Sequence, residues 1–213
     1  MGGRGSSSGG GSGGGGVGGD INVKSSQSLI SLRNEGKRAE ADQVLTVLRD
    51  VEREFGVTIG DAVVAKLGRG DMTTLAAMYR GSGDLMFNQR FFDEQKATQA
   101  YDSCVQSGFH PSRGEKSAIE AIAAHEMGHR INYIAAENAG TDMETVASSA
   151  VKSAAKGLGM TVKEFKAGIS GYAQKNYVET VAEAYADVYC NGSGAKAGSK
   201  AVVEFIKSSF FKS

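Results

Sequence analysis

Two histidines four residues apart most constrain what this chain can fold into. The stretch AIAAHEMGHRINYIAA, residues 121–136, contains two of the three histidines of the sequence, His125 and His129. Residues four apart on an α-helix lie on the same face, so the spacing predicts a helix that presents two imidazoles to one point. Two imidazoles directed at one point are a ligand pair for zinc. The fold must then bring a further ligand to this helix from elsewhere in the chain.

Glu126, directly after the first histidine, supplies the second part of the motif. On a helix it projects about 100° away from His125, which keeps its carboxylate off the metal but close to a water on the metal. Zinc lowers the pKa of such a water to about 7, and an adjacent carboxylate can take its proton. H-E-x-x-H is accordingly a metalloprotease motif, and the sequence predicts a zinc site with Glu126 as the general base. Gly128 within the same helix predicts that another segment passes close to the backbone there.

The third ligand is sought among acids further along the chain. Glu179, Glu183 and Asp187 recur at intervals of four residues, along one stripe of a predicted helix. An acidic stripe is ordinarily a solvated face. The rest of this segment is mostly apolar, so we expect its acids to be partly buried and to need a cation or a metal. For Glu179 alone, a capping box with Asn176 is a competing interpretation.

Together, HEMGH and the segment YAQKNYVETVAEA resemble the catalytic domain of anthrax lethal factor and its relatives, which are zinc peptidases of the gluzincin type. The downstream motif of that family, Y-x-x-x-N-x-x-E-x-x-A-E-A, is matched over residues 172–184. By this resemblance Glu179 is the third zinc ligand and Tyr172 reaches toward the oxyanion. Glu183 is by the same resemblance an acid that orients a ligand histidine. The similarity covers residues from about 115 to 190.

Two further resemblances leave alternatives open. EAYAD, residues 183–187, is similar to the thermolysin-like pattern, in which Glu183 would be the ligand and Asp187 would support a histidine. The low-complexity N-terminus, the GFHP loop and the two motifs together resemble metallopeptidase domains of bacteriophage head or minor capsid proteins. His110, within that loop, is interpreted as an ordinary loop histidine rather than a ligand.

The remaining sequence predicts an α+β fold. Apolar residues recur at helical spacing within residues 25–56, and the patterns are again helical from Asp93 onward. Between them lie three short segments typical of strands, separated by Gly and Asp clusters. We expect a zincin-like arrangement: a small, mostly antiparallel sheet, an active-site helix and a C-terminal helical subdomain. The segment GDLMFN, residues 83–88, is predicted to be the sheet edge along which an extended peptide would bind.

Composition divides the chain into two parts and limits its partners. Residues 1–19 are almost entirely Gly and Ser and are predicted to form a disordered tail, because they have little apolar surface to bury. Residues 20–213 are predicted to form one domain. The formal net charge is zero and the pI is near 6.8, which argues against nucleic acid or an anionic membrane surface as a partner.

The sequence also predicts where the protein acts and on what. No apolar run approaches the roughly 18 residues of a membrane span, and the N-terminus lacks the apolar core of a signal peptide. We therefore expect a cytoplasmic location, with association with a virion as an alternative. The motifs predict a zinc metalloendopeptidase that hydrolyses a protein or peptide substrate, with phage structural proteins as candidates. A non-catalytic zinc-binding module of a virion and a toxin or effector protease with a single target are the other two hypotheses.

Overall fold

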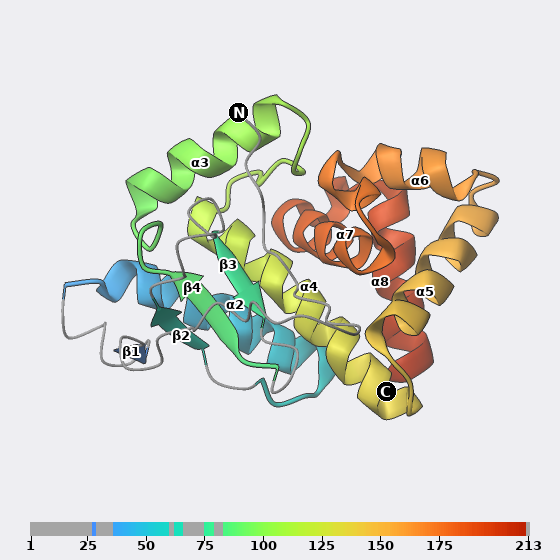
Figure 1. The fold of residues 1–213 in the computed structure, drawn as a ribbon, viewed down its shortest axis with the longest axis horizontal. Coiled ribbons are helices and arrows are strands. Elements are labelled where there is room, and N and C mark those ends of the chain that lie inside the picture. The colour runs from blue at the N-terminus through green and yellow to red at the C-terminus, as the bar shows by residue number, and fades with distance from the viewer. Residues whose placement is uncertain (1–26, 29–35, 60–61, 66–74, 79–82, 212–213) are drawn as a thin grey trace, which may run out of the picture.

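The computed structural model describes five stretches of the chain, residues 27–28, 36–59, 62–65, 75–78 and 83–211. The predicted tail, residues 1–19, lies outside the described residues. The architecture is α+β, as predicted, with a small sheet on one side of a long central helix and a group of helices on the other (Figure 1).

The sheet is mixed. Its four strands are β1 (Gln27–Ser28), β2 (Ala62–Ala65), β3 (Ala76–Met78) and β4 (Leu85–Asn88), in the spatial order β1-β2-β4-β3. The outer pairs β1–β2 and β3–β4 are antiparallel, whereas the central pair β2–β4 is parallel. The prediction of a small sheet is thus confirmed; two of its three strand pairs are antiparallel, as a mostly antiparallel sheet requires, and the central pair is parallel.

The edge of this sheet is not the strand that the sequence predicted. The segment 83–88 contains β4, which lies between β2 and β3. All four residues of β4 are buried, as expected for a central strand covered on both faces. The edge that approaches the central helix is β3.

Helix α2 (Arg38–Phe55) follows the first strand. Its buried residues recur at helical spacing, and it ends at Gly56, which adopts the left-handed conformation with φ 65°. The sequence predicted helix from about residue 25. Residues 27–28 form β1 instead, and residues 29–35 lie outside the described residues.

The long central helix is α4 (Ala118–Ala139), which follows α3 (Glu94–Gln106). Ser117 and Glu120 form a complete capping box at its start, and Gly140 ends it with φ 62°. Most of α4 is buried from its first residue to Asn132, because other elements cover it on several sides. Figure 1 shows α4 crossing the middle of the molecule, with α2, α3 and the sheet on one side.

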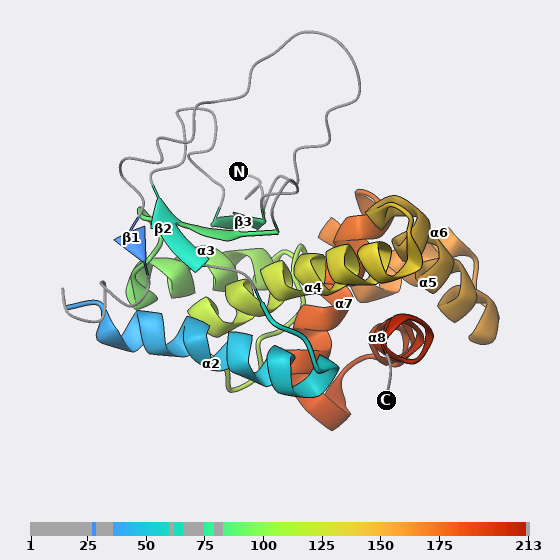
Figure 2. The same ribbon diagram turned by 90° about the horizontal axis from the view of Figure 1, so that it is seen from below.

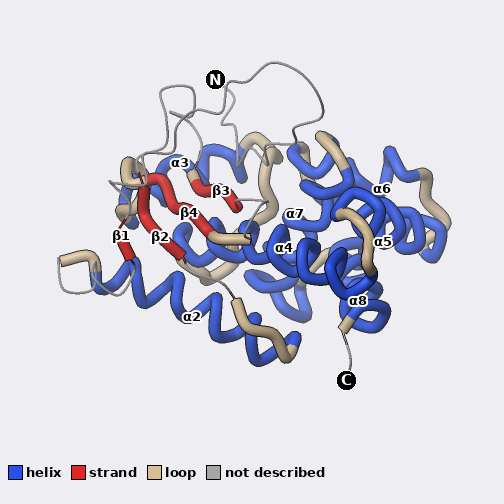
Figure 3. The backbone as a smooth tube through the Cα atoms, turned by 60° about the horizontal axis from the view of Figure 1, so that its bottom comes forward, coloured by secondary structure: helices blue, strands red, loops and turns tan. Residues whose placement is uncertain are grey.

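The chain beyond α4 is helical, as predicted, and packs on the other side of α4 (Figures 1 and 2). Figure 3 shows the same separation, with all the strands on one side of the molecule. Among the described residues, no helix is both long and apolar enough to cross a membrane. The helices are α5 (Met143–Gly157), α6 (Val162–Ile169), the 3-10 turn η3 (Tyr172–Gln174), α7 (Tyr177–Asn191), the 3-10 turn η4 (Gly192–Gly194) and α8 (Ala197–Phe210).

At Gly128, α7 packs directly against the backbone of α4. A Cβ atom at this position would lie 2.7 Å from Ala182 Cα and 3.0 Å from Tyr185 Cβ, which is far inside normal contact distance. The prediction that another segment passes close to Gly128 is therefore confirmed. Since Gly128 directly precedes His129, this close packing brings one face of α7 against the histidine face of α4.

Candidate metal centre

Three buried side chains converge where α7 packs on α4. His125 and His129 project from α4, and Glu179 projects from the first turn of α7. Glu179 Oε2 lies 3.4 Å from His125 Nε2 and 3.2 Å from His129 Nε2. One ligand atom from each of the three residues lies within 4.8 Å of the other two, which is close enough for all three to hold one ion.

These separations fit a tetrahedral metal site. Bonds of about 2.0–2.2 Å to nitrogen and oxygen, at tetrahedral angles, place neighbouring ligand atoms about 3.3–3.5 Å apart. The contacts of 3.4 and 3.2 Å from Glu179 Oε2 to His125 and His129 come close to this spacing. Two imidazole nitrogens and one carboxylate oxygen are also the donor set of many catalytic zinc sites.

Two of the converging atoms lack any other partner. Among the described residues, His129 Nε2 and Glu179 Oε2 are buried side-chain atoms with no hydrogen-bond partner. A buried polar atom without a partner costs about 1–3 kcal/mol, and more when it carries charge. A cation held between the two histidines and Glu179 would remove that cost, so the residues present fit a zinc ion.

Glu183 contacts the other nitrogen of the first histidine. Its Oε1 lies 2.7 Å from His125 Nδ1 and 2.8 Å from His110 Nδ1. His110, His125 and Glu183 form the second group that could hold an ion. Both distances, however, are shorter than the spacing of about 3.3 Å between tetrahedral ligand atoms and lie in the hydrogen-bond range. The geometry therefore favours Glu179 as the ligand and Glu183 as the acid that supports His125.

His110 lies in a loop, as predicted, but it is not an exposed loop residue. Its side chain is buried and donates from Nδ1 to Glu183. Its ring stacks on Tyr101, with the ring centroids 5.4 Å apart and an interplanar angle of 5°. Local patterns do not indicate this contact, because Glu183 is 73 residues away in the chain.

The second oxygen of Glu179 is held by two donors. Tyr172 Oη donates to Glu179 Oε1 at 3.0 Å, and Lys175 Nζ lies 3.0 Å from the same atom. Lys175 also donates to Tyr172 Oη at 2.8 Å. Burial and Glu179 raise the pKa of Tyr172 far above its usual range, so the hydroxyl keeps its proton. Asn176 caps α7 by accepting from the backbone nitrogen of Glu179, while the carboxylate of Glu179 contacts His125 and His129.

The charges of this cluster depend on one another. Burial by itself would lower the pKa of His125, but contacts with Glu179 and Glu183 outweigh it and raise the pKa to about 10. Burial would likewise raise the pKa of Glu179, yet His129 and His125 hold it well below its usual range. The pKa of Glu183 falls to about 2, because His110 and His125 outweigh the effect of burial. The two carboxylates thus favour the protonated form of His125 in the metal-free protein, and a metal ion bound at its ring would compete with a proton.

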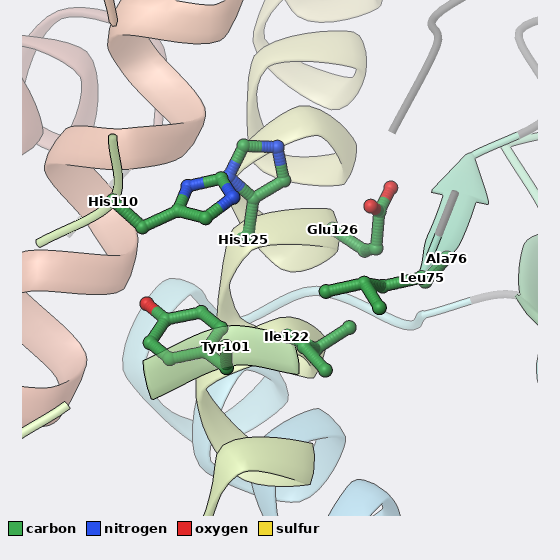
Figure 4. Close-up of a pocket in the computed structure, with 7 residues that line it drawn as sticks. All are labelled: Leu75, Ala76, Tyr101, His110, Ile122, His125 and Glu126. Atoms are coloured by element: carbon green, nitrogen blue, oxygen red, sulfur yellow. The ribbon is translucent and has the colours of Figure 1, made fainter. Parts of the chain in front are cut away.

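Glu126 lies beside a small cavity next to His110 and His125. The cavity volume is about 20 Å³, and one water needs roughly 10–15 Å³. Figure 4 shows His125 and Glu126 leaving neighbouring positions of α4 in different directions, His125 toward His110 and Glu126 toward the side of β3. Glu126 is 1% exposed. The cavity is lined by Leu75, Ala76, Tyr101, His110, Ile122, His125 and Glu126.

Asp187 lies apart from the converging side chains. Its Oδ1 accepts from Asn191 Nδ2 at 2.9 Å, and its Oδ2 accepts from the backbone nitrogen of Lys196 at 3.0 Å. Within the described part of the chain, neither group of side chains that could hold an ion includes Asp187. These contacts of Asp187 therefore do not support the thermolysin-like alternative, in which Asp187 would hold a histidine.

No protein family, curated protein or solved structure that was compared with this chain matches it. The resemblances to lethal factor, to thermolysin-like enzymes and to phage metallopeptidase domains therefore stay predictions from the sequence motifs.

Proposed function

We propose that this protein is a zinc-dependent metalloendopeptidase, with His125, His129 and Glu179 as the zinc ligands. The observation that carries the proposal is the convergence of two imidazole nitrogens with a buried carboxylate oxygen, two of these three atoms lacking a hydrogen-bond partner in the described structure. Glu126, next to the first ligand and at the edge of a water-sized cavity, supports hydrolysis over a purely structural metal.

Zinc at this site would act as a Lewis acid toward a carbonyl group and would lower the pKa of a water molecule beside it. Among the protein's own side chains, Glu126 acts as the general base. Its carboxylate accepts the proton of the attacking water and delivers it to the nitrogen of the leaving amine. Buried surroundings favour this transfer, because they exclude bulk water that would compete for the proton.

Two hydrogen-bond donors near Glu179 could stabilise the negative charge that develops on the carbonyl oxygen of the substrate. Tyr172 keeps its proton, and its hydroxyl lies 3.0 Å from the ligand carboxylate, at the rim of the proposed metal position. Lys175, whose side chain is 45% exposed, lies against both Tyr172 and Glu179. A hydrogen bond from Tyr172 to the oxyanion would strengthen in the transition state and so speed the reaction.

The sheet edge supports a peptide as substrate. Strand β3 forms the edge nearest α4, and Leu75 and Ala76 line the cavity together with Glu126. An extended peptide that paired with β3 would run past this cavity, with its backbone held by hydrogen bonds to the strand. We propose proteins or peptides as the substrate class on this ground, including the phage structural proteins that the sequence resemblance suggests.

The decisive comparison is between the wild type and Glu126→Gln, with Glu137→Gln as the matched control. Glu137 lies on the same helix but is exposed. Zinc content would be measured together with cleavage of a peptide library. We expect one zinc per chain in all three proteins, and a fall in kcat/KM of about 100-fold or more for Glu126→Gln alone.

Each other outcome has a definite meaning. Equal cleavage by Glu126→Gln and the wild type would show that Glu126 is not the base. Zinc binding without cleavage of any peptide in the wild type would favour the non-catalytic zinc-binding module. Absence of zinc from the wild type would remove the metal centre itself.

A further inference from the structure

Glu183 is held by three separate segments of the chain. Its Oε1 contacts His125 Nδ1 from α4 and His110 Nδ1 from the loop between α3 and α4. Its Oε2 accepts from Ser170 Oγ at 2.6 Å. Ser170 Oγ in turn accepts from the backbone nitrogen of Ala173 at 3.0 Å, which fixes the direction in which the serine donates. This buried carboxylate thus accepts hydrogen bonds on both oxygens, from His110 and Ser170, and also contacts His125.

The direction of these contacts follows from the chemistry of the carboxylate. An ionised carboxylate only accepts hydrogen bonds, so His110 Nδ1, which is hydrogen-bonded to Glu183 at 2.8 Å, must carry its proton. The same carboxylate lies 2.7 Å from His125 Nδ1 and favours a proton on that nitrogen as well. A proton on Nδ1 of His125 leaves Nε2 of the neutral ring as the atom with a free lone pair. That atom is the one that lies beside Glu179 and His129 in the proposed metal site.

His110 is itself fixed by its surroundings. Its ring stacks on Tyr101, whose hydroxyl donates to the carbonyl oxygen of Pro111 at 3.2 Å. The backbone just before His110 is tied to the turn before α7, because Gly171 N donates to Gly108 O at 2.8 Å and Tyr172 N donates to Phe109 O at 2.9 Å. The loop thus holds His110 in register with the segment that carries Ser170.

From these contacts we propose that His110 is a positioning residue for the metal site. It holds the Glu183 carboxylate against His125 Nδ1, and Glu183 then keeps His125 Nε2 directed at the ion. This inference rests on the proposed zinc site, but it assigns to His110 a role that the H-E-x-x-H motif does not contain. Because His110 acts on the orientation of a ligand, its loss should change the zinc affinity and the state of the His125 ring even when no substrate is present.

Two substitutions separate this role from simple packing. In His110→Phe the ring that stacks on Tyr101 remains, but the donor to Glu183 is lost. In His110→Asn the stacking ring is lost, but the side-chain amide places a donor close to the position of the Nδ1 atom. A positioning role predicts that His110→Asn keeps the zinc affinity and His110→Phe loses it, whereas a packing role predicts the reverse.

Two readouts are measured on the full chain. Zinc affinity is determined by competition with a chelator, and the ¹⁵N resonances of the imidazoles are recorded in the metal-free protein, where only three histidines contribute. We expect zinc affinity to fall by about tenfold in His110→Phe, at the lower end of the effect of removing a partner of a metal ligand, and to stay close to the wild-type value in His110→Asn. The His125 Nδ1 resonance should shift in His110→Phe and stay at its wild-type position in His110→Asn.

Every other result overturns the inference. If both variants lose affinity equally, or if Phe is tolerated and Asn is not, His110 serves packing or binds the ion itself. If neither affinity nor the His125 resonance changes, Glu183 needs no help from His110. Should the wild type bind no zinc, the proposed function fails, and the resonance of His125 in the metal-free variants still decides the role of His110.

Discussion

Substitution of Gly128 by alanine tests whether the packing of α7 on α4 sets the metal geometry. The new Cβ would lie 2.7 Å from Ala182 Cα and 3.0 Å from Tyr185 Cβ. Carbon atoms in contact are normally about 3.5–4.0 Å apart, so the two helix backbones must separate by about 1 Å at this point. Neither obstacle is the flexible end of a side chain, so a rotamer change cannot relieve the contact.

The cost to stability should be modest. Forced insertion of a methyl group into a packed interface costs about 1–3 kcal/mol, whereas replacing glycine by alanine inside a helix gains about 1 kcal/mol. We therefore expect the free energy of unfolding of the metal-free protein to fall by about 0–2 kcal/mol.

The effect of Gly128→Ala on zinc affinity should be larger than its effect on stability. Glu179 projects from α7 and the histidines from α4, so a shift of about 1 Å would widen the present contacts of 3.2 and 3.4 Å beyond tetrahedral spacing. Metal–ligand distances tolerate only about 0.2 Å of change. We expect zinc affinity, measured by chelator competition, to fall by about tenfold or more.

Gly168→Ala is the matched control. Gly168 is an exposed glycine in α6, and a Cβ there would meet only Met160 Cε at 4.0 Å. This variant should be as stable as the wild type or up to about 1 kcal/mol more stable, with unchanged zinc affinity. If Gly128→Ala bound zinc as tightly as Gly168→Ala, the argument that this close approach positions Glu179 would be refuted.

Four further predictions concern the same centre. Glu183→Gln should lower zinc affinity by about 10–100-fold, measured by the same competition, and an unchanged affinity would mean that Glu183 does not orient a ligand. Zinc uptake at pH 7 should release about one proton from His125, because its pKa in the metal-free protein is raised to about 10; calorimetry in buffers of different ionisation enthalpy measures this, and zero release would contradict it. The same raised pKa predicts that protonated His125 stabilises the metal-free fold fully below pH 6.5, its ordinary pKa, and that this contribution is lost as the pH rises toward 10; urea unfolding with chelator across that range would show the loss. Tyr172→Phe should lower kcat by about 100-fold on a cleaved peptide while zinc stays bound, and equal kcat values would exclude the hydroxyl from the reaction.

The sequence predicted the parts of the site that depend on local geometry. The spacing of His125 and His129 needs only a helix to bring both rings to one face, and the structure has that helix. The apolar residues around Glu179 and Glu183 indicated that these acids would be buried, and both are. Gly128 predicted a close approach of another segment because an unfavourable helix residue needs a packing reason.

The features that were missed depend on contacts between distant segments. His110 is 73 residues from Glu183 in sequence, and nothing near it in the chain marks it as buried. The order of the strands places β3 at the edge instead of the segment 83–88, which local patterns cannot decide because pairing is non-local. The thermolysin-like role of Asp187 was implied by the resemblance of EAYAD to that pattern, whereas in the structure its carboxylate accepts from the backbone at the start of α8.

The most direct test of the metal centre is a crystal structure of the zinc-loaded protein with anomalous diffraction data collected at the zinc edge. We predict a single strong anomalous peak bonded to His125 Nε2, His129 Nε2 and Glu179 Oε2, with Glu183 still at His125 Nδ1. A peak between His110, His125 and Glu183, or no peak at either group of side chains, would contradict the account.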